Sequence, residues 1–337
     1  MRRMNIFKYV LLLPAALVFA SSCVDDNTGT LGDVGKTTVK LNPDQFKVVA
    51  VNAISNEQTL PLIEIYKEAN GSTDLNKASS VTLKVDINVL NAYNDELLAQ
   101  WVDEGGDPAD FVPFEYPTGL ITISPTPSTT DSTIVLNMAA GEFAKNVMIT
   151  IPDALQFDFL KKYAIPIKLV SVSGAGEKSQ AVEDWVVVQV MVKNKWDGKY
   201  EVTELSPMVD IINATLTGYY PFKYLLVTSG TNTCDAYWDM LGAPGHPISA
   251  SGSLSYYGSF GLTVEFAVDG TITKLTNWYG TPTNTRRPEL DPSGVNKWDP
   301  ATGNIEIKYW MLQPSLVQDP PHIRTYFHEK WTYKGDR

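Results

Sequence analysis

Apolar and polar residues alternate along most of the chain between residues 37 and 193. Residues 60–66 and 81–89 alternate with period two, which is typical of strands buried on one face. Further short runs of this kind, separated by turn residues, predict strands at 38–41, 46–49, 120–123, 133–138, 146–151, 163–172 and 185–192. Closely spaced short strands favour an immunoglobulin-like β-sandwich over residues 37–193.

One segment of this region has the period of a helix instead. In residues 91–102, Leu97, Leu98 and Trp101 share one face at three- and four-residue spacing, and a Gly-Gly pair at 105–106 ends the helix. Pro166 lies inside the predicted strand 163–172. Because proline donates no ladder hydrogen bond, we expect that strand at a sheet edge or Pro166 at its start.

Composition shifts near residue 194. Of the eight Trp residues, six follow at or after Trp196, and all three His residues lie there too. Asp269-Gly270 is a strong hairpin turn. The predicted strands are 198–203, 224–228, 262–268, 272–277, 305–310 and 325–333. Residues 194–337 therefore form a second, aromatic-rich β domain, either a β-meander or a small lipocalin-like barrel, which makes the protein mainly all-β.

The first 22 residues have the layout of a secretory signal peptide. A basic start with Arg2, Arg3 and Lys8 precedes an apolar run over 9–20 and small residues at 20–22. The apolar run is shorter than the roughly 20 residues that a spanning helix needs. Cys23 follows at once and resembles the acylated cysteine of bacterial lipoproteins, although Ala20 replaces the usual Leu. Acyl chains on Cys23 would anchor the protein stably.

The segment after the cysteine is a predicted tether. Residues 23–36 are rich in Gly, Asp, Asn and Thr and contain little to bury. Asp25 and Asp26 resemble the acidic tag that directs Bacteroidetes-type lipoproteins to the outer face of the outer membrane. We therefore expect a lipid-anchored outer-membrane protein that faces the cell exterior.

Charge and cysteine content exclude some functions. Loss of Arg2, Arg3 and Lys8 with the signal peptide changes the formal net charge from −11 to −14. An acidic protein repels phosphate backbones, so we expect no nucleic-acid partner. Cys234 is the one other cysteine once Cys23 is acylated, and we expect it to be a small buried hydrophobic residue rather than a reactive thiol.

Two stretches resemble known modules. The alternating strand and helix near 88–101, the Ala-Gly-Glu turn at 140–142 and the YAIPIKLVSVSG strand from Tyr163 resemble domain of unknown function 1735 of Bacteroidetes surface lipoproteins. The WDGKY segment from Trp196, continuing to Arg337, is similar to domain of unknown function 4361. This resemblance implies polysaccharide utilisation beside a starch-utilisation-type outer-membrane transporter. Relatives that carry a glycoside hydrolase family 18 barrel differ, because its acidic motif is missing here.

The common catalytic and metal motifs are missing from the sequence. It has no nucleophile elbow, no zinc-binding HExxH and no phosphate loop, and we predict no enzyme, no cofactor and no metal site. His322 and His328 share a strand face by spacing, but zinc would need two more ligands. The acidic loop from Asp103 to Asp110 could offer oxygen ligands to Ca²⁺, but it does not have EF-hand spacing, and the sequence leaves this open.

Aromatic residues in predicted loops of the second domain are the candidate ligand contacts. The C–H faces of sugars stack on flat rings, and loops on a rigid scaffold commonly carry binding residues. The candidates are Tyr237, Trp238, Tyr256, Tyr257, Trp278, Tyr279 and Trp298. For any one of them, a place in the core is the alternative.

The sequence thus predicts a cell-surface glycan-binding lipoprotein that captures oligosaccharide for an outer-membrane uptake system. The main alternative is a non-catalytic adhesion or assembly component that binds a protein. A glycoside hydrolase would need two carboxylates across one cleft. The sequence does not specify the glycan, closure of a barrel or the oligomeric state.

Overall fold

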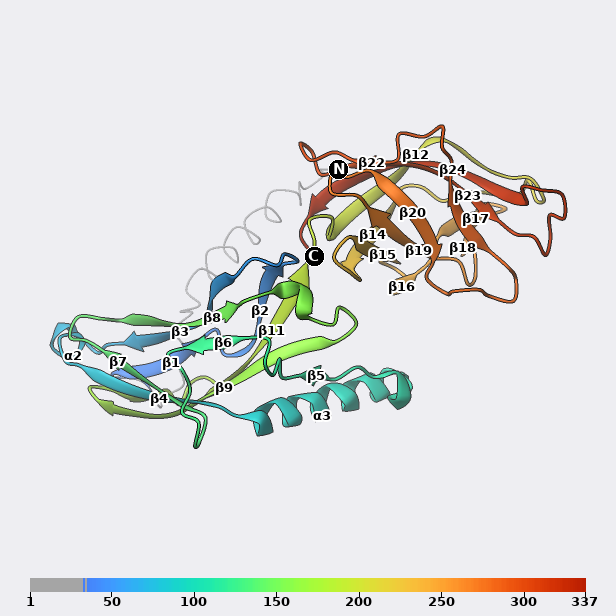
Figure 1. Ribbon diagram of the computed structural model, residues 1–337. Helices are drawn as coiled ribbons and strands as arrows, with labels where there is room; N and C mark the ends of the chain where they lie inside the picture. The colour runs from blue at the N-terminus through green and yellow to red at the C-terminus, as the bar shows by residue number, and fades with distance from the viewer. Residues whose placement is uncertain (1–32, 34) are drawn as a thin grey trace, which may run out of the picture.

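The computed structural model describes residue 33 and residues 35–337. The predicted signal peptide, Cys23 and most of the predicted tether lie outside these residues. Two β bodies follow one another along the chain and are joined between β11 and β12 (Figure 1). None of the helices in the described ranges is long and apolar enough to cross a membrane.

The first body is a sandwich of two sheets. One sheet has the order β10-β1-β3-β8-β6 and the other β2-β11-β9-β4-β7, with β5 added beside β9. The first contains β1 Thr38–Asn42, β3 Gln58–Glu68, β6 Thr122–Ser124, β8 Ala144–Ile151 and β10 Glu177–Lys178; the second contains β2 Gln45–Asn52, β4 Ser79–Val85, β5 Phe114–Glu115, β7 Thr133–Met138, β9 Lys162–Gly174 and β11 Trp185–Lys193.

Alternation along these strands builds the core between the sheets. In β4, every second residue from Ser79 to Val85 is buried, and in β7 Ile134, Leu136 and Met138 are buried. These side chains pack with Ile63, Ile149 and their neighbours in one apolar cluster. The predicted all-β sandwich is therefore confirmed.

The helix α3, Ile87–Asp103, starts four residues earlier than expected and takes over the end of the predicted strand 81–89. Asp86 caps it, because its carboxylate accepts a hydrogen bond from the backbone N–H of Asn88. The strand β4 therefore ends at Val85. Shorter helices are α2 Ser72–Leu75 and the 3₁₀ turns Pro108–Asp110 and Ala154–Gln156.

The prediction for Pro166 was wrong, because β9 is an interior strand between β11 and β4. The proline is nevertheless tolerated for a local reason. The ladder between β4 and β9 ends at the Val85–Ile167 pair, and the carbonyl of Pro166 accepts from the N–H of Asp86, where the chain turns into α3. Pro166 therefore lies just beyond the last residue pair between β9 and β4, where no β4 carbonyl is left for its absent N–H to bond.

The second body is one large sheet that curves round to nearly close a barrel. Its order is β20-β19-β15-β14-β12-β24-β23-β21, and the end strands β20 and β21 lie beside one another. The strands are β12 Gly198–Asp210, β14 Phe222–Thr228, β15 Thr233–Trp238, β19 Leu262–Phe266, β20 Ile272–Asn277, β21 Arg287–Leu290, β23 Ile305–Leu312 and β24 Ile323–Gly335, with β16 Ala243–Pro244 beside β15 and β22 Lys297–Trp298 beside β23.

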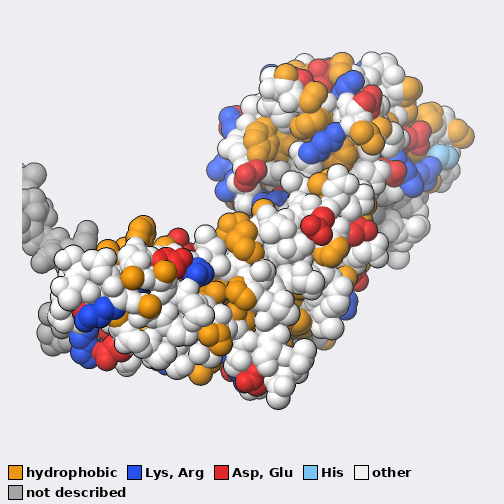
Figure 2. Space-filling model, turned by 60° about the vertical axis from the view of Figure 1, so that its left-hand side comes forward, with side chains coloured by type: hydrophobic (Ala, Val, Ile, Leu, Met, Phe, Trp, Pro, Cys, Tyr) orange, Lys and Arg blue, Asp and Glu red, His pale blue; other side chains and the backbone are white. Residues whose placement is uncertain are grey.

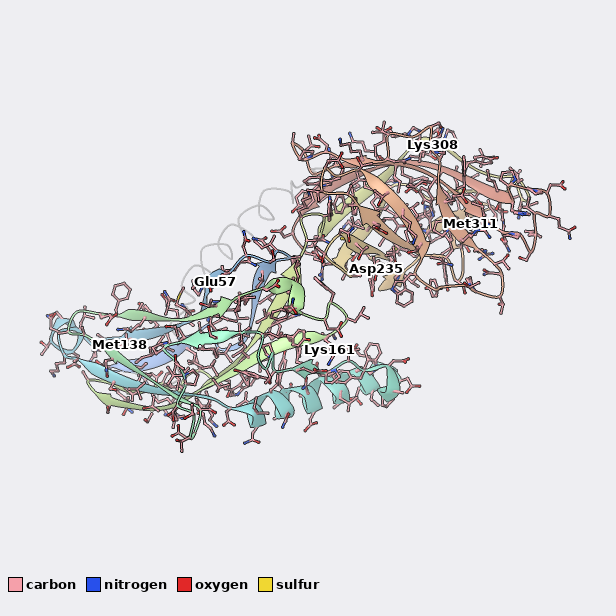
Figure 3. The ribbon with its side chains drawn as sticks, in the orientation of Figure 1. Glu57, Met138, Lys161, Asp235, Lys308 and Met311 are labelled. Atoms are coloured by element: carbon pink, nitrogen blue, oxygen red, sulfur yellow. The ribbon has the colours of Figure 1, made fainter. Side chains whose placement is uncertain are left out.

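A small sheet and an aromatic core complete this body. The strands β13 Leu216–Gly218, β17 Pro247–Ala250 and β18 Ser253–Tyr256 form the small sheet. The interior is filled by Tyr200, Tyr224, Phe260, Phe327, Trp331 and other large side chains. In Figure 3, Lys308 lies at the outer rim and Met311 lies inside, as alternation along β23 requires.

Strand direction defines two ends of the barrel. The far end carries Phe222, Trp238, Leu262, Asn277, Leu312 and Ile323, because these residues begin or end strands that pair there. The near end carries Gly198, Phe266 and Gly335, close to the first body. The described sheets do not share strands across residue 194, which supports our proposal of a domain boundary there.

Candidate functional site

Three of the seven candidate aromatics are well exposed. Tyr256 is 47 % exposed, Trp278 is 45 % exposed and Tyr279 is 38 % exposed. Tyr237 is half-buried. These four side chains belong to elements that meet at the far end of the barrel, and we refer to them as the end patch.

Ring contacts and a hydrogen bond hold the end patch together. The rings of Trp278 and Tyr279 meet edge to face with centroids 5.0 Å apart, and the hydroxyl of Tyr279 donates to the carbonyl of Pro244 at 2.8 Å. Pro244 pairs with Tyr237 across the β15–β16 hairpin, which brings Tyr279 beside Tyr237. Tyr256 lies at the same end of the barrel, because its ring centroid is 6.2 Å from that of Trp238, the residue that follows Tyr237 in β15.

The tyrosines of the end patch are also close enough to influence one another electrostatically. Burial raises the pKa of Tyr237, and the neighbouring Asp235 and Tyr279 raise it further. Burial likewise raises the pKa of Tyr279, with a contribution from Tyr256. The phenols of Tyr237 and Tyr279 therefore keep their protons at neutral pH and can donate hydrogen bonds.

Asn277, at the end of β20, fixes the loop that carries Trp278 and Tyr279. Its side-chain oxygen accepts from the backbone N–H groups of Gly261 and Tyr279, and its amide nitrogen donates to the carbonyls of Ser259 and Arg286. Gly280 closes the turn with φ +68° and donates to the carbonyl of Asn277 at 2.9 Å. The turn therefore aims two aromatic rings outward from a rigid base.

The remaining candidates do not offer free ring faces at this end. Trp238 and Tyr257 are 5 % and 2 % exposed and belong to the core. The expectation that Tyr237 and Trp238 lie in a loop was wrong, because both belong to β15. Alternation in β15 buries Trp238 and turns Tyr237 outward.

Trp298 lies at the near end of the barrel instead. It meets Trp196 edge to face at 6.5 Å, and the ammonium of Lys195 lies 4.9 Å from the ring of Trp196 and 5.3 Å from that of Trp298. The indole nitrogens of both Trp residues are buried without a hydrogen-bond partner. This aromatic pair seals the barrel end next to the first body.

A polar network inside the barrel was missed by the sequence reasoning. Glu329 and His246 are fully buried, with Oε1 of Glu329 2.7 Å from Nε2 of His246. The same carboxylate accepts from the hydroxyl of Tyr220 at 2.6 Å and from the indole N–H of Trp331 at 2.8 Å. A buried Glu on a strand of alternating pattern was its one sequence signal.

The polar atoms of this network have their hydrogen-bond partners inside the core. Nδ1 of His246 faces the carbonyl of Pro247 at 2.9 Å, so Nδ1 carries a hydrogen. Nε2 faces Oε1 of Glu329, so both ring nitrogens of His246 have a hydrogen-bond partner. A second buried carboxylate, Asp210, is held by Arg324 at 2.9 Å and by Tyr257 at 2.7 Å. Both carboxylates are satisfied within the core rather than aimed at a cleft.

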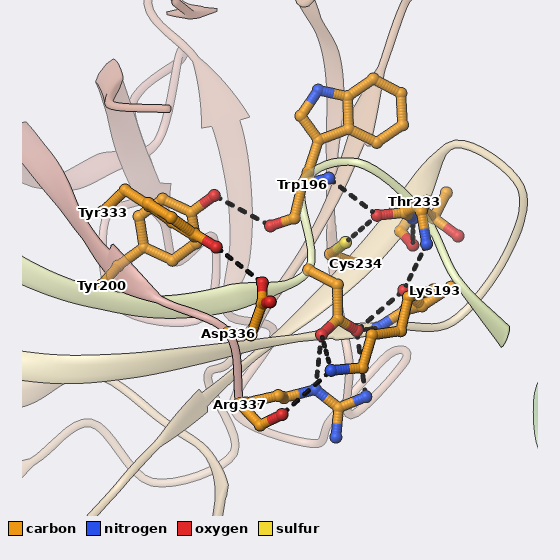
Figure 4. A network of polar contacts seen from close by, with 11 residues as sticks. Lys193, Trp196, Tyr200, Thr233, Cys234, Tyr333, Asp336 and Arg337 are labelled. Carbon is orange, nitrogen blue, oxygen red and sulfur yellow. Dashed lines mark hydrogen bonds and ion pairs between the residues drawn. The ribbon is translucent and has the colours of Figure 1, made fainter. Parts of the chain in front are cut away.

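A third network joins the end of the chain to the segment between the two bodies (Figure 4). The carboxylate of Asp197 accepts from Nε and Nη2 of Arg337 at 2.8 and 3.0 Å, and from the N–H and hydroxyl of Thr228. Lys193 donates to the carbonyl of Arg337 at 2.9 Å. This network fixes the start of β12.

Cys234 lies in the same region and is fully buried, as predicted. Its sulfur lies 3.1 Å from the side-chain oxygen of Asn194. Burial raises the pKa of its thiol, so the thiol stays protonated. It is a packing residue.

The predicted histidine pair is not arranged for metal binding. His322 has φ +68° and directs Nδ1 to the carbonyl of Val317, whereas His328 faces Glu306 at 3.2 Å. In the acidic loop, Asp107 caps the 3₁₀ turn by accepting from the N–H of Ala109. Within the described ranges, no three His, Cys, Asp or Glu residues are grouped to hold a metal ion.

The fold and the end patch define a two-part β protein with an exposed aromatic surface at the far end of the barrel in its second body. Residues 35–176 match a family model described as a "-like, N-terminal domain". The predicted resemblance to Bacteroidetes proteins with domain of unknown function 1735 is confirmed. The resemblance of residues 196–337 to domain of unknown function 4361 stays a prediction.

Several solved structures are similar to the chain over most of its length. A protein of unknown function from Bacteroides ovatus is 14 % identical, with 89 % of this chain and 95 % of that chain covered and a TM-score of 0.49. A multidomain protein including DUF1735 from the same organism is 14 % identical, with 88 % and 92 % covered and a TM-score of 0.46. An auxiliary nutrient binding protein from Bacteroides thetaiotaomicron is 13 % identical, with 86 % and 90 % covered and a TM-score of 0.44. No curated protein matches the chain.

Proposed function

We propose that this protein binds glycans at the cell surface through the end patch and passes them to an outer-membrane uptake system. The observation that carries the proposal is the gathering of the exposed side chains of Trp278, Tyr279 and Tyr256 at one end of the barrel. Large aromatics are costly to expose in such numbers unless a ligand covers them.

The chemistry of the end patch suits sugars. Ring faces carry negative charge density and stack on the weakly positive C–H faces of a pyranose, while phenol hydroxyls and backbone groups exchange hydrogen bonds with sugar hydroxyls. The loop is fixed by Asn277, so little conformational entropy is lost when a ligand binds.

A lipid anchor at Cys23 and a position facing the cell exterior remain part of the proposal. They are supported by the basic start, the short apolar run and the acidic pair Asp25-Asp26. An anchored protein with its aromatic surface on the second body would hold that surface away from the membrane.

A non-enzymatic role agrees with the sealed carboxylates. Glu329 and Asp210 are each held by several internal donors, and a glycosidase needs two carboxylates that reach one substrate bond. We therefore propose capture without cleavage.

Affinity electrophoresis tests the proposal. The purified full chain is run through native gels that contain starch, xylan, mannan, pectin or mucin glycans. At least one polymer should retard the wild type, and Trp278→Ala should reduce that retardation. Trp101→Ala is the matched control, because Trp101 is 40 % exposed in the first body. Unretarded migration of the folded wild type in every gel would argue against the proposal.

A further inference from the structure

The outer side of the barrel carries an ordered row of residues on four neighbouring strands. Glu289 on β21 lies directly opposite Trp310 on β23, Trp310 lies opposite Tyr326 on β24, and Tyr326 lies opposite Val209 on β12. We call these four residues the lateral row. Neighbouring strands are about 4.8 Å apart, so the row spans roughly 14 Å.

All four side chains point away from the core. Their neighbours along each strand, such as Tyr309, Met311 and Phe327, are buried, and alternation turns the row to the opposite side. Val209 is 50 % exposed and Tyr326 is 41 % exposed, while Trp310 is half-buried and Glu289 is exposed. Two large aromatic residues therefore occupy paired positions on the outer face.

A polar row runs parallel to the lateral row, one step along the strands. Lys308 pairs with His328, and His328 pairs with Ser206. Lys308 is held in place by Ser293 at 2.7 Å and Asp291 at 3.1 Å, and His328 by Glu306 at 3.2 Å. The polar side chains of Lys308 and His328 are thus held in fixed positions next to the aromatic residues and do not cover their rings.

Charges of both signs lie on and next to the row: Glu289 and Glu306 are acidic, and Lys308 is basic. Figure 2 shows hydrophobic side chains of the second body mixed with basic and acidic ones instead of a single-sign field. A strongly charged polymer would bind best to a protein surface on which charges of the opposite sign dominate. An uncharged sugar chain instead needs a surface that offers both hydrogen-bond donors and acceptors to its hydroxyl groups.

The lateral row also lies toward the same barrel end as the end patch. Met311 and Leu312, next to Trp310, pair with Pro288 and Arg287, and the carbonyl of Arg286 accepts from the side chain of Asn277 beside Trp278. Trp278 turns outward from the end of β20, which lies beside β21. The two aromatic surfaces therefore lie on adjoining strands.

From this arrangement we infer that the lateral row is a second sugar-contact surface and that the ligand is an extended polysaccharide segment crossing β21, β23 and β24. The inference rests on the proposed function. One chain contacts both surfaces, so binding strengthens with chain length by raising the effective concentration at the second surface. A short oligosaccharide fills one surface and gains nothing from the other.

The competing occupant is a protein. Leu205, Ile211 and Ile212 near Val209 are exposed aliphatic residues, which are common at protein interfaces. The paired Trp and Tyr with a fixed polar row on one side favour a sugar chain, because aliphatic side chains give sugars no ring face to stack on.

The test compares long and short ligands on three variants. The polymer that retards the wild type is used intact and after digestion to short oligosaccharides, with Trp310→Ala/Tyr326→Ala for the row, Trp278→Ala for the end patch and Trp101→Ala as control. The row variant should lose about tenfold in affinity for the intact polymer and less than twofold for the short oligosaccharides. Trp278→Ala should weaken both.

Circular dichroism and thermal unfolding confirm that each variant is folded, and Tyr326→Ser alone provides a milder change. If the folded row variant binds intact polymer as tightly as the wild type, the inference is overturned and a protein becomes the better candidate partner for this face. The proposed function would still stand in that case, provided that Trp278→Ala weakens binding. If the wild type binds no polymer, both fall.

Discussion

Replacement of Glu329 by Leu should strongly destabilise the second body. Glu329 is fully buried and accepts hydrogen bonds from Tyr220 and Trp331 in addition to its contact with His246. Leucine has a similar volume but accepts no hydrogen bond. The substitution therefore removes the partner of four polar groups, those of His246, Trp331, Tyr309 and Tyr220, and keeps the packing nearly intact.

The magnitude follows from the loss of these hydrogen-bond partners. Each buried polar group left without a partner costs about 1–3 kcal/mol, and removal of one member of a buried ion pair typically costs about 3–5 kcal/mol. We expect Glu329→Leu to lower the free energy of unfolding by about 3–5 kcal/mol, a large part of the roughly 5–15 kcal/mol that domains have. Glu329→Gln keeps an acceptor and a donor and should cost about half as much.

Urea unfolding followed by tryptophan fluorescence measures these changes. Glu289→Leu is the matched control, because Glu289 is exposed on β21 and should change stability by less than about 0.5 kcal/mol. A double substitution with His246→Leu should recover part of the loss, since both ionisable partners are then gone. Equal stability of Glu329→Leu and the wild type would refute the reasoning that the network is desolvated.

Three further predictions concern turns and the thiol. Gly270→Ala should lower the free energy of unfolding in urea by about 1–3 kcal/mol more than Gly242→Ala. Both positions have positive φ, but a Cβ at Gly270 would lie 2.6 Å from the carbonyl oxygen of Trp298, whereas a Cβ at Gly242 would meet open space. Equal losses for the two variants would contradict this prediction. Hydrogen bonds from the N–H and hydroxyl of Thr271 hold the pKa of Asp269 below its usual value, so the stabilisation of the fold by ionised Asp269 is present above about pH 3.9 and is lost as the pH falls through the lower pKa of the folded state. Thr271→Val should therefore raise the pKa of Asp269 in a carboxyl NMR titration. An unchanged pKa would contradict the role given to the Thr271 hydroxyl. In a Cys23→Ser variant, Cys234 should react with a thiol reagent at pH 8 only after unfolding, because burial raises the pKa of its thiol, and rapid labelling of the native protein would contradict its burial.

Period-two alternation was enough to predict most strands of the sandwich. The run at 133–138 coincides with β7, because its residues alternate between a buried and an exposed side. Asp86 was the overlooked signal at the start of α3: its cap allows residues 87–89 to continue the helix although they also fit the preceding alternation.

The candidate site was harder to predict than the fold. The exposure of Trp278 and Tyr279 could be predicted because a Gly and a turn follow them, which sends side chains to the surface. Tyr237 and Trp238 read as a loop because the glycine and proline after them suggested one, but pairing of β15 with β14 places them in a strand. The pairs Glu289–Trp310 and Trp310–Tyr326 depend on register between distant strands, which one sequence does not specify.

Isothermal titration of the wild type and of Trp278→Ala with the glycan that gives the strongest retardation tests the central claim most directly. Glycan capture at the far end of the barrel predicts at least about a tenfold weaker dissociation constant for Trp278→Ala and an unchanged one for Trp101→Ala. Identical binding curves for all three proteins, with each of them folded, would contradict it.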